Sequence, residues 1–325
     1  MYRTIYGPVP SRRLGISLGV DIIPYKICSF NCIYCECGKN TQLTVERKDF
    51  IPVEVVIEEI NDYLSKNPYP DFITVSGSGE PTLHLKLGEL LKILKKLHPD
   101  VKIAVLTNSS LIHLKEVREE LYFSDVILPS LDAALERSFK LINRPHSSIK
   151  LEDIIKGLIE LGKEIKSVSI DRQIWLEIFI VEGINTDDEN ISALKKACID
   201  INPDRIQLNT LDRPGAESWV KPASKSTLEM IKQKLDLPNV EIISKFKHRD
   251  EIKHYRVDVE SAILELVERR PSTLFDISEI LGIPVEEARK YMEILEHEKR
   301  IYPKIVYSEN GNSIFYLLNR EKKFS

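Results

Sequence analysis

The chain has 325 residues, and its 46 Lys and Arg against 50 Asp and Glu give a formal net charge of -4. This balance excludes a protein that binds polyanions through bulk charge, although it is compatible with a local basic patch. No apolar run approaches the ~18 residues of a membrane-spanning helix, and residues 1–10 lack the apolar core of a signal peptide. We therefore expect a cytoplasmic protein without membrane association, built from two domains or from one large barrel with an appendage.

Apolar runs alternate with helical patterns through the first three quarters of the chain. The predicted strands cover residues 16–23, 71–76, 101–106, 125–128, 173–181 and 204–209. The predicted helices cover residues 53–64, 85–97, 114–122, 153–165, 187–199 and 226–235. Apolar strands that alternate with helices predict an α/β fold with a parallel sheet covered by helices. Six strand–helix units suit either a doubly wound sheet or an incomplete barrel.

After about residue 246 the pattern changes. Residues 247–256 are charged and polar, and we predict a linker there. Residues 257–325 are predicted to form a second, smaller domain. Its expected elements are helices at residues 257–269, 276–281 and 284–300 and strands at residues 301–307 and 314–318. Asn310-Gly311 between the two strands is a strong hairpin signal, and three helices followed by a hairpin describe a winged helix.

The cysteines are unevenly distributed. Cys28, Cys32, Cys35 and Cys37 lie within ten residues, and Cys198 is alone. Clustered cysteines in a protein that is not secreted indicate a metal or redox site rather than a disulfide framework. Soft thiolates favour iron–sulfur clusters or zinc, and a structural zinc site would need a fourth ligand such as Cys37. Buried thiols without a metal are a further alternative.

The motif Cys28-x3-Cys32-x-Tyr34-Cys35 resembles the defining motif of radical S-adenosylmethionine (radical SAM) enzymes. This resemblance implies a partial (β/α)6 TIM-like barrel over residues 1–246, including an N-terminal extension. It also implies a [4Fe-4S] cluster held by the three cysteines, with S-adenosylmethionine on the remaining iron. Tyr34 is either a cofactor-binding residue or a core aromatic beside the loop.

The chemistry implied by the resemblance is radical formation. One electron, from a donor such as ferredoxin or flavodoxin, cleaves S-adenosylmethionine to methionine and a 5′-deoxyadenosyl radical. The radical then abstracts hydrogen from a substrate. No motif identifies that substrate, which could be an RNA, a peptide or a small molecule.

Other strand ends carry residues that the resemblance assigns to S-adenosylmethionine. Gly79 and Glu80 resemble the segment that binds the methionine amino group, although a serine stands where the family has its first glycine. Asn108, Ser130 and Asp132 follow later strands, where the family places contacts to the ribose and the carboxylate. Helix capping is the structural alternative, because Ser, Asn and Asp favour caps and turns.

Residues 7–15 and 35–39 resemble a branch of radical SAM proteins grouped with the wyosine synthases of tRNA. True wyosine synthases carry a second cysteine trio before the main motif, and here no cysteine precedes Cys28. A tRNA-modifying enzyme is therefore the second hypothesis, after a radical SAM enzyme of unidentified substrate. A cluster-containing winged-helix DNA-binding regulator is the third. Five acidic against four basic residues at 284–300 argue against duplex DNA as a partner.

Overall fold

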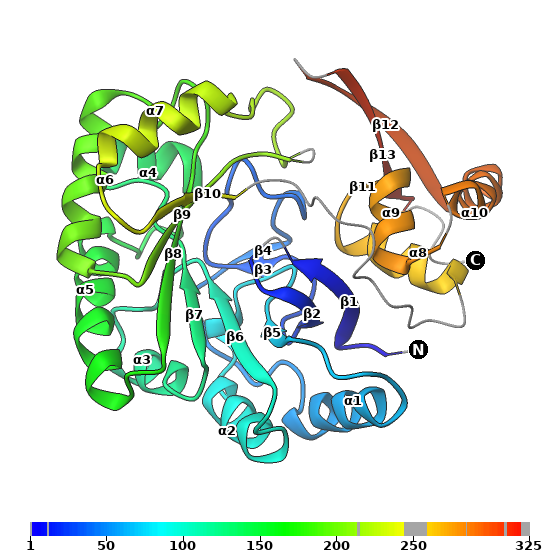
Figure 1. Ribbon diagram of the computed structural model, residues 1–325, viewed down its shortest axis with the longest axis horizontal. Helices are drawn as coiled ribbons and strands as arrows, with labels where there is room; N and C mark the ends of the chain where they lie inside the picture. The colour runs from blue at the N-terminus through cyan, green and yellow to red at the C-terminus, as the bar shows by residue number, and fades with distance from the viewer. Residues whose placement is uncertain are drawn as a thin grey trace.

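The computed structural model describes residues 2–11, 13–212, 215–243, 259–283, 285–308 and 311–319. The main sheet has eight strands (Figure 1). In their hydrogen-bonded order these are β1 (Ile5–Ser11), β2 (Gly15–Val20), β5 (Phe72–Val75), β6 (Lys102–Thr107), β7 (Val126–Pro129), β8 (Gln173–Phe179), β9 (Arg205–Asn209) and β10 (Val240–Ile242). Strands β1 and β2 are antiparallel, and every later pair of neighbours is parallel. The predicted α/β fold with a parallel sheet is confirmed.

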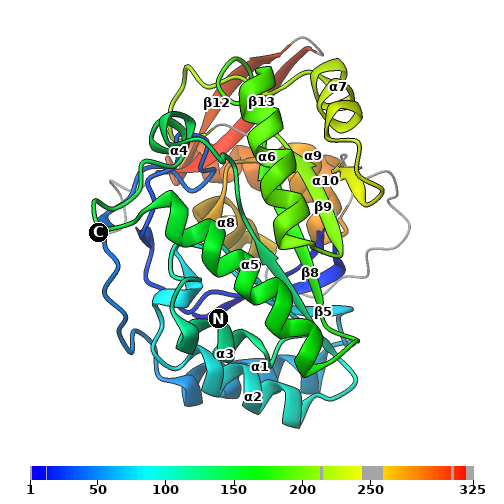
Figure 2. The same cartoon turned by 90° about the vertical axis from the view of Figure 1, so that its left-hand side faces the viewer.

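Seven helices accompany this sheet in the described residues. They are α1 (Val53–Lys66), α2 (Leu87–Leu97), α3 (Lys115–Leu121), α4 (Glu136–Asn143), α5 (Leu151–Val168), α6 (Asp188–Ile201) and α7 (Lys225–Leu235). Figure 1 shows the long helices outside the curved sheet, and Figure 2 shows this helical layer from its outer side. Edge strands β1 and β10 are not neighbours, so the described sheet is open. An open curved sheet with helices outside agrees with an incomplete barrel.

Alternation along the strands separates two faces of the sheet. Leu18 and Val20 of β2 are buried in the large core beneath the helices. Ser17, the residue before Leu18, points to the other face because side chains alternate along a strand. There it contacts Thr74 of β5, with 2.5 Å between the two hydroxyl oxygens. The concave face therefore carries polar groups beside a small apolar cluster, which leaves room for a polar site.

Strands β1 and β10 and helix α4 are among the elements of this part that were not predicted. Strand β1 contains Gly7, Pro8 and Pro10, which disfavour a strand in the interior of a sheet. At an edge, proline is tolerated because its missing N–H need not join a ladder. Strand β10 has only three residues, and helix α4 has only eight, so neither provides a clear periodic signal.

The C-terminal segment, residues 259–319, has an apolar core of its own. Its elements are α8 (Val259–Arg269), β11 (Ser272–Thr273), α9 (Leu274–Leu281), α10 (Val285–His297), β12 (Ile301–Ser308) and β13 (Gly311–Leu318). Strand β13 pairs with both β11 and β12. Three helices and a hairpin are thus present as predicted, while the winged-helix assignment stays a prediction. The predicted linker at 247–256 and the turn residues 309 and 310 lie outside the described residues.

Candidate functional site

The cysteine loop begins near the carboxyl end of β2. Cys28 ends the short strand β3 (Ile27–Cys28), which pairs with β4 (Gln42–Leu43). Cys32 and Cys35 lie on the loop between these strands, and all three side chains are half-buried free thiols. The loop is held from another direction by the end of α4, because the amide of Ile33 donates to the carbonyl of Ile142 at 2.9 Å.

Each of the three predicted ligand thiols lies beside a different nitrogen donor. The sulfur–nitrogen distances are 3.4 Å for Cys28 and Asn108 Nδ2, 3.5 Å for Cys32 and Asn143 Nδ2, and 3.1 Å for Cys35 and Lys26 Nζ. Such donors stabilise thiolate charge, and hydrogen bonds to sulfur help to set the reduction potential of iron–sulfur clusters. Neither Lys26 nor Asn143 was predicted from the sequence to belong to this site. Lys26 stands two residues before Cys28, so its position was the available signal.

The surroundings shift the pKa values of these thiols in opposite directions. Burial raises the pKa of Cys28 to about 12 and also raises the pKa of Cys32. A hydrogen bond with Cys37 and the charge of Lys26 lower the pKa of Cys35. Lys26 is only 2% exposed, so its ammonium group acts in a poorly hydrated environment. The protein therefore favours the thiolate form first at Cys35.

Glu80 lies in the turn after β5 and is 2% exposed. Its Oε1 accepts hydrogen bonds from Thr82 N at 3.0 Å, Thr82 Oγ1 at 2.6 Å and Thr107 Oγ1 at 2.6 Å. Its Oε2 accepts from the backbone amide of Asn108 at 2.7 Å. Among the described residues Oε2 accepts this one bond, against three at Oε1, so Oε2 is the oxygen with capacity for a further donor. Asn108 links Glu80 to Cys28. Its backbone amide donates to the Glu80 carboxylate, and its side-chain amide donates to the Cys28 thiol.

Gly79 is needed where this turn approaches the cysteine loop. A Cβ atom added at Gly79 would lie 2.4 Å from the carbonyl oxygen of Ile27. The neighbouring amide of Glu80 donates to the same carbonyl at 3.2 Å. The glycine therefore permits the contact that fixes Glu80 beside Cys28.

Asp132 forms a second buried group with Tyr34. Its carboxylate accepts from Tyr34 Oη at 2.6 Å, from Asn143 Nδ2 at 2.6 Å and from Phe179 N at 3.0 Å. The Tyr34 ring stacks on Phe179 with 3.8 Å between centroids. Burial raises the pKa of Asp132 to about 6. Asn143 joins this group to Cys32, as Asn108 joins Glu80 to Cys28.

Three further residues considered from the sequence, Ser130, Cys37 and Cys198, lie in different parts of the fold. Ser130 follows β7, and its amide donates to the carbonyl of Thr107 at 3.0 Å. Cys37 donates from Sγ to the carbonyl of Arg269 at 3.2 Å, and Cys198 is buried in the core through α6. The resemblance assigns the cluster to Cys28, Cys32 and Cys35, and the exclusion of Cys37 and Cys198 as ligands stays a prediction.

The three thiols on this loop are soft donors of the kind that hold iron–sulfur clusters or zinc. Among the described residues, no three His, Cys, Asp or Glu side chains are grouped so that they could hold one metal ion. In a [4Fe-4S] cluster each thiolate binds a different iron, so the three sulfurs need not converge on one point. Three soft thiols on one loop, each beside an N–H donor, provide this kind of ligand set.

The family of the chain follows from comparison of its sequence with known proteins. The Radical SAM superfamily matches residues 22–194, which is more than half of the chain and includes the cysteine loop. The chain belongs to the radical SAM superfamily. Membership supports the predicted enzyme class and implies S-adenosylmethionine and an iron–sulfur cluster as its cofactors.

Curated relatives of this radical SAM chain differ in length. It is 35% identical over 246 residues to a Brachyspira hyodysenteriae protein named GTPase Obg, with 73% of this chain and 35% of that protein covered. It is 32% identical over 286 residues to UPF0026 protein MJ1312 of Methanocaldococcus jannaschii, with 85% of each covered. The chain therefore spans about a third of the first relative and most of the second.

Solved structures show the same fold. One is SuiB of Streptococcus suis bound to S-adenosylmethionine, with a TM-score of 0.52, 16% identity, and coverage of 71% of this chain and 51% of that chain. Within the described ranges, no helix combines the length and the hydropathy that a membrane span requires.

Proposed function

We propose that this protein is a radical SAM enzyme in which Cys28, Cys32 and Cys35 hold a [4Fe-4S] cluster. When bound, the cluster supplies the electron that cleaves S-adenosylmethionine, and the resulting 5′-deoxyadenosyl radical abstracts hydrogen from a substrate. The observation that carries this proposal is the placement of three thiols, each beside its own nitrogen donor, next to the buried Glu80.

The residues around the thiols would divide the work of holding the cluster. Lys26 offsets thiolate charge at Cys35, while Asn108 and Asn143 supply neutral N–H groups to the other two sulfurs. Together, the one charged and the two neutral donors would stabilise the three thiolates without adding a fourth ligand. With these three thiols as its protein ligands, a [4Fe-4S] cluster would keep one iron available to S-adenosylmethionine.

Glu80 is the residue best placed to bind the amino group of S-adenosylmethionine. Its Oε2 lies on the same side as Asn108, which also reaches Cys28, and it has capacity for a charged N–H donor. Hydrogen bonds to charged groups contribute about 1.5–3 kcal/mol. Its four internal hydrogen bonds keep the carboxylate in one orientation, which limits the entropy lost on binding.

We also propose that the C-terminal segment is a winged-helix domain that screens or presents the substrate. Helices α8 and α9 contact β1 at the edge of the main sheet. The segment therefore packs against the barrel-like domain rather than standing apart from it. This position favours a role in substrate access over a role in reading duplex DNA.

The test is anaerobic reconstitution with iron and sulfide, followed by reduction with dithionite in the presence of S-adenosylmethionine. We expect formation of 5′-deoxyadenosine, with a rate that rises when a cell-derived RNA, peptide or small-molecule fraction supplies the substrate. The matched variants are Cys32→Ala, which should abolish the product, and Cys37→Ala, which should not. A reconstituted protein that binds a cluster yet never cleaves S-adenosylmethionine would contradict the proposal.

A further inference from the structure

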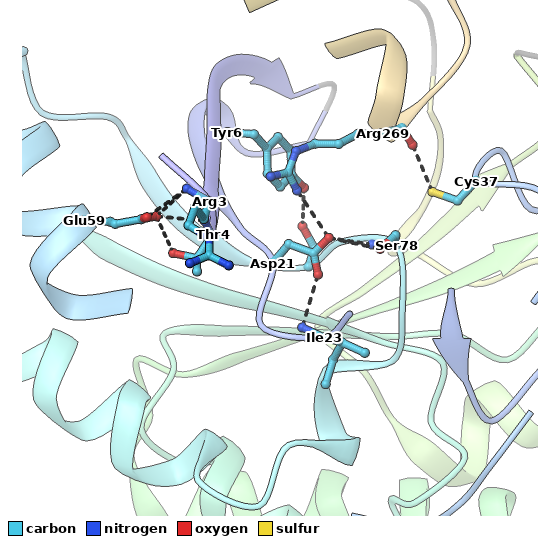
Figure 3. Close-up of polar contacts among 10 residues, drawn as sticks. Arg3, Thr4, Tyr6, Asp21, Ile23, Cys37, Glu59, Ser78 and Arg269 are labelled. Atoms are coloured by element: carbon cyan, nitrogen blue, oxygen red, sulfur yellow. Dashed lines mark hydrogen bonds and ion pairs between the residues drawn. The ribbon is translucent and has the colours of Figure 1, made fainter. Parts of the chain in front are cut away.

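Arg269 connects the C-terminal segment to the cysteine-bearing domain at the end of α8. Figure 3 shows its side chain lying over Tyr6 and reaching the carboxylate of Asp21. The guanidinium carbon is 4.4 Å from the centre of the Tyr6 ring, and Nη1 is 3.2 Å from Asp21 Oδ2. The side chains of Asp21 and Arg269 are 10% and 21% exposed, so this ion pair is largely removed from water.

Asp21 is also bonded to the turn that carries Glu80. Its Oδ2 accepts from the amide of Ser78 at 3.0 Å and from the Ser78 hydroxyl at 3.1 Å, while its Oδ1 accepts from Ile23 N at 3.3 Å. A Cβ atom added at Gly77 would lie 2.1 Å from Asp21 Cγ, so the turn packs directly on the carboxylate. One carboxylate therefore joins α8, the end of β2 and the turn before Glu80.

Arg269 makes a second contact with the cysteine loop. Its carbonyl oxygen accepts a hydrogen bond from Cys37 Sγ at 3.2 Å (Figure 3). Cys37 stands two residues after Cys35. The same residue of α8 thus touches the segments on both sides of the proposed cofactor site.

A cavity of about 840 Å³ lies between the concave face of the sheet and the C-terminal segment. It falls in the size range of small-molecule sites, roughly 300–1,000 Å³. Its walls come from both parts of the chain, among them Thr74, Ser78, Cys37, Arg269, Phe275 and Tyr316. Because the C-terminal segment supplies one wall, its placement determines the shape of the cavity.

The buried carboxylate makes this junction sensitive to the arginine. Burial raises the pKa of Asp21, and the charge of Arg269 acts in the opposite direction. Truncating the arginine would leave a buried carboxylate without its cation, a change that is strongly destabilising for the local structure. The Ser78 turn would be the first part to readjust, because it shares that carboxylate.

We infer that Arg269 is a positioning residue that couples the docking of the C-terminal segment to the turn that binds S-adenosylmethionine. This inference rests on the proposed function. Coupling between two sites is reciprocal. The docked segment therefore strengthens S-adenosylmethionine binding, and bound S-adenosylmethionine tightens the contact of α8 with the main sheet.

The experiment compares Arg269→Ala with Arg300→Ala in the full-length protein. Arg300 pairs with Glu260 in the same segment, with side chains about two-fifths exposed, so it controls for loss of an arginine there. Hydrogen exchange of the apoprotein should show faster exchange of α8 and of the Ser78 amide only in Arg269→Ala. After reconstitution to equal iron content, the dissociation constant of Arg269→Ala for S-adenosylmethionine should rise by about five- to hundredfold. This is the usual size of the coupling between two sites of one protein.

The variant Arg269→Lys keeps the result interpretable if the alanine variant folds poorly. Lysine retains the charge but not the planar fork or the stacking, so we expect partial recovery of affinity. Unchanged affinity in a folded, cluster-loaded Arg269→Ala protein would overturn the inference and leave the proposed function intact. A wild-type protein that holds the cluster but does not bind S-adenosylmethionine would overturn both.

Discussion

Replacing Glu80 by glutamine changes one atom in a pocket where both carboxylate oxygens accept hydrogen bonds. Whichever oxygen becomes the NH2 group, it meets a backbone N–H: that of Thr82 at the Oε1 position or that of Asn108 at the Oε2 position. One donor–donor contact is therefore unavoidable. The change also removes the negative charge proposed to bind the amino group of S-adenosylmethionine.

Two separate effects follow, and their sizes can be estimated. A buried donor left without an acceptor costs about 1–3 kcal/mol, so the apoprotein should lose stability by that order. Burial raises the pKa of Glu80, which means that removing its charge relieves part of its desolvation and keeps the loss near the lower end. Loss of a charge-assisted hydrogen bond worth about 1.5–3 kcal/mol should weaken S-adenosylmethionine binding roughly ten- to hundredfold.

Urea unfolding of the apoprotein measures the first effect, and calorimetry with reconstituted protein measures the second. Glu89→Gln, an exposed change on α2, serves as the matched control and should alter neither quantity. Iron content should stay at the wild-type level in both variants, because Glu80 is not a cluster ligand. Equal S-adenosylmethionine affinity in wild type and Glu80→Gln would refute the assignment and leave Glu80 a purely structural role.

Two further predictions concern Asp132 and α10. Because the pKa of folded Asp132 is raised to about 6 from 3.8, the folded apoprotein binds more protons than the unfolded chain, and its stability should fall by up to about 3 kcal/mol as pH rises from about 4 to 6. Asp132→Asn should flatten that slope in urea titrations, and an unchanged slope would assign it to other groups. Helix α10 carries four acidic and two basic residues, so duplex DNA should not bind with submicromolar affinity at about 150 mM salt. Binding that survives nonspecific competitor would revive the regulator hypothesis.

The sequence was informative where the signal is local. The six strand–helix units follow from apolar periodicity, and the thiol set follows from the spacing of Cys28, Cys32 and Cys35. Asn108 and Asp132 were predicted as site residues because they follow parallel strands, which end at one edge of the sheet. All of these predictions depend on short stretches of chain.

The contacts that complete the site are long-range, which explains why they were missed. Asn143 reaches Cys32 across 111 positions, and Arg269 reaches Asp21 across 248 positions. Neither residue lies in a motif, and Asn143 ends a helix too short to be predicted. Arg144, the residue after α4, is a further long-range case, because its Nη1 lies 2.6 Å from Oε1 of Glu217 across 73 positions.

The most direct test of this account is to count iron and sulfide in single cysteine-to-alanine variants after anaerobic reconstitution. We predict about four irons per chain in wild type and in Cys37→Ala. Cys28→Ala, Cys32→Ala and Cys35→Ala should each lose the cluster. If Cys37→Ala loses iron as completely as Cys32→Ala, the site is a closed four-thiolate centre. Such a centre would leave no iron for S-adenosylmethionine and would contradict the account.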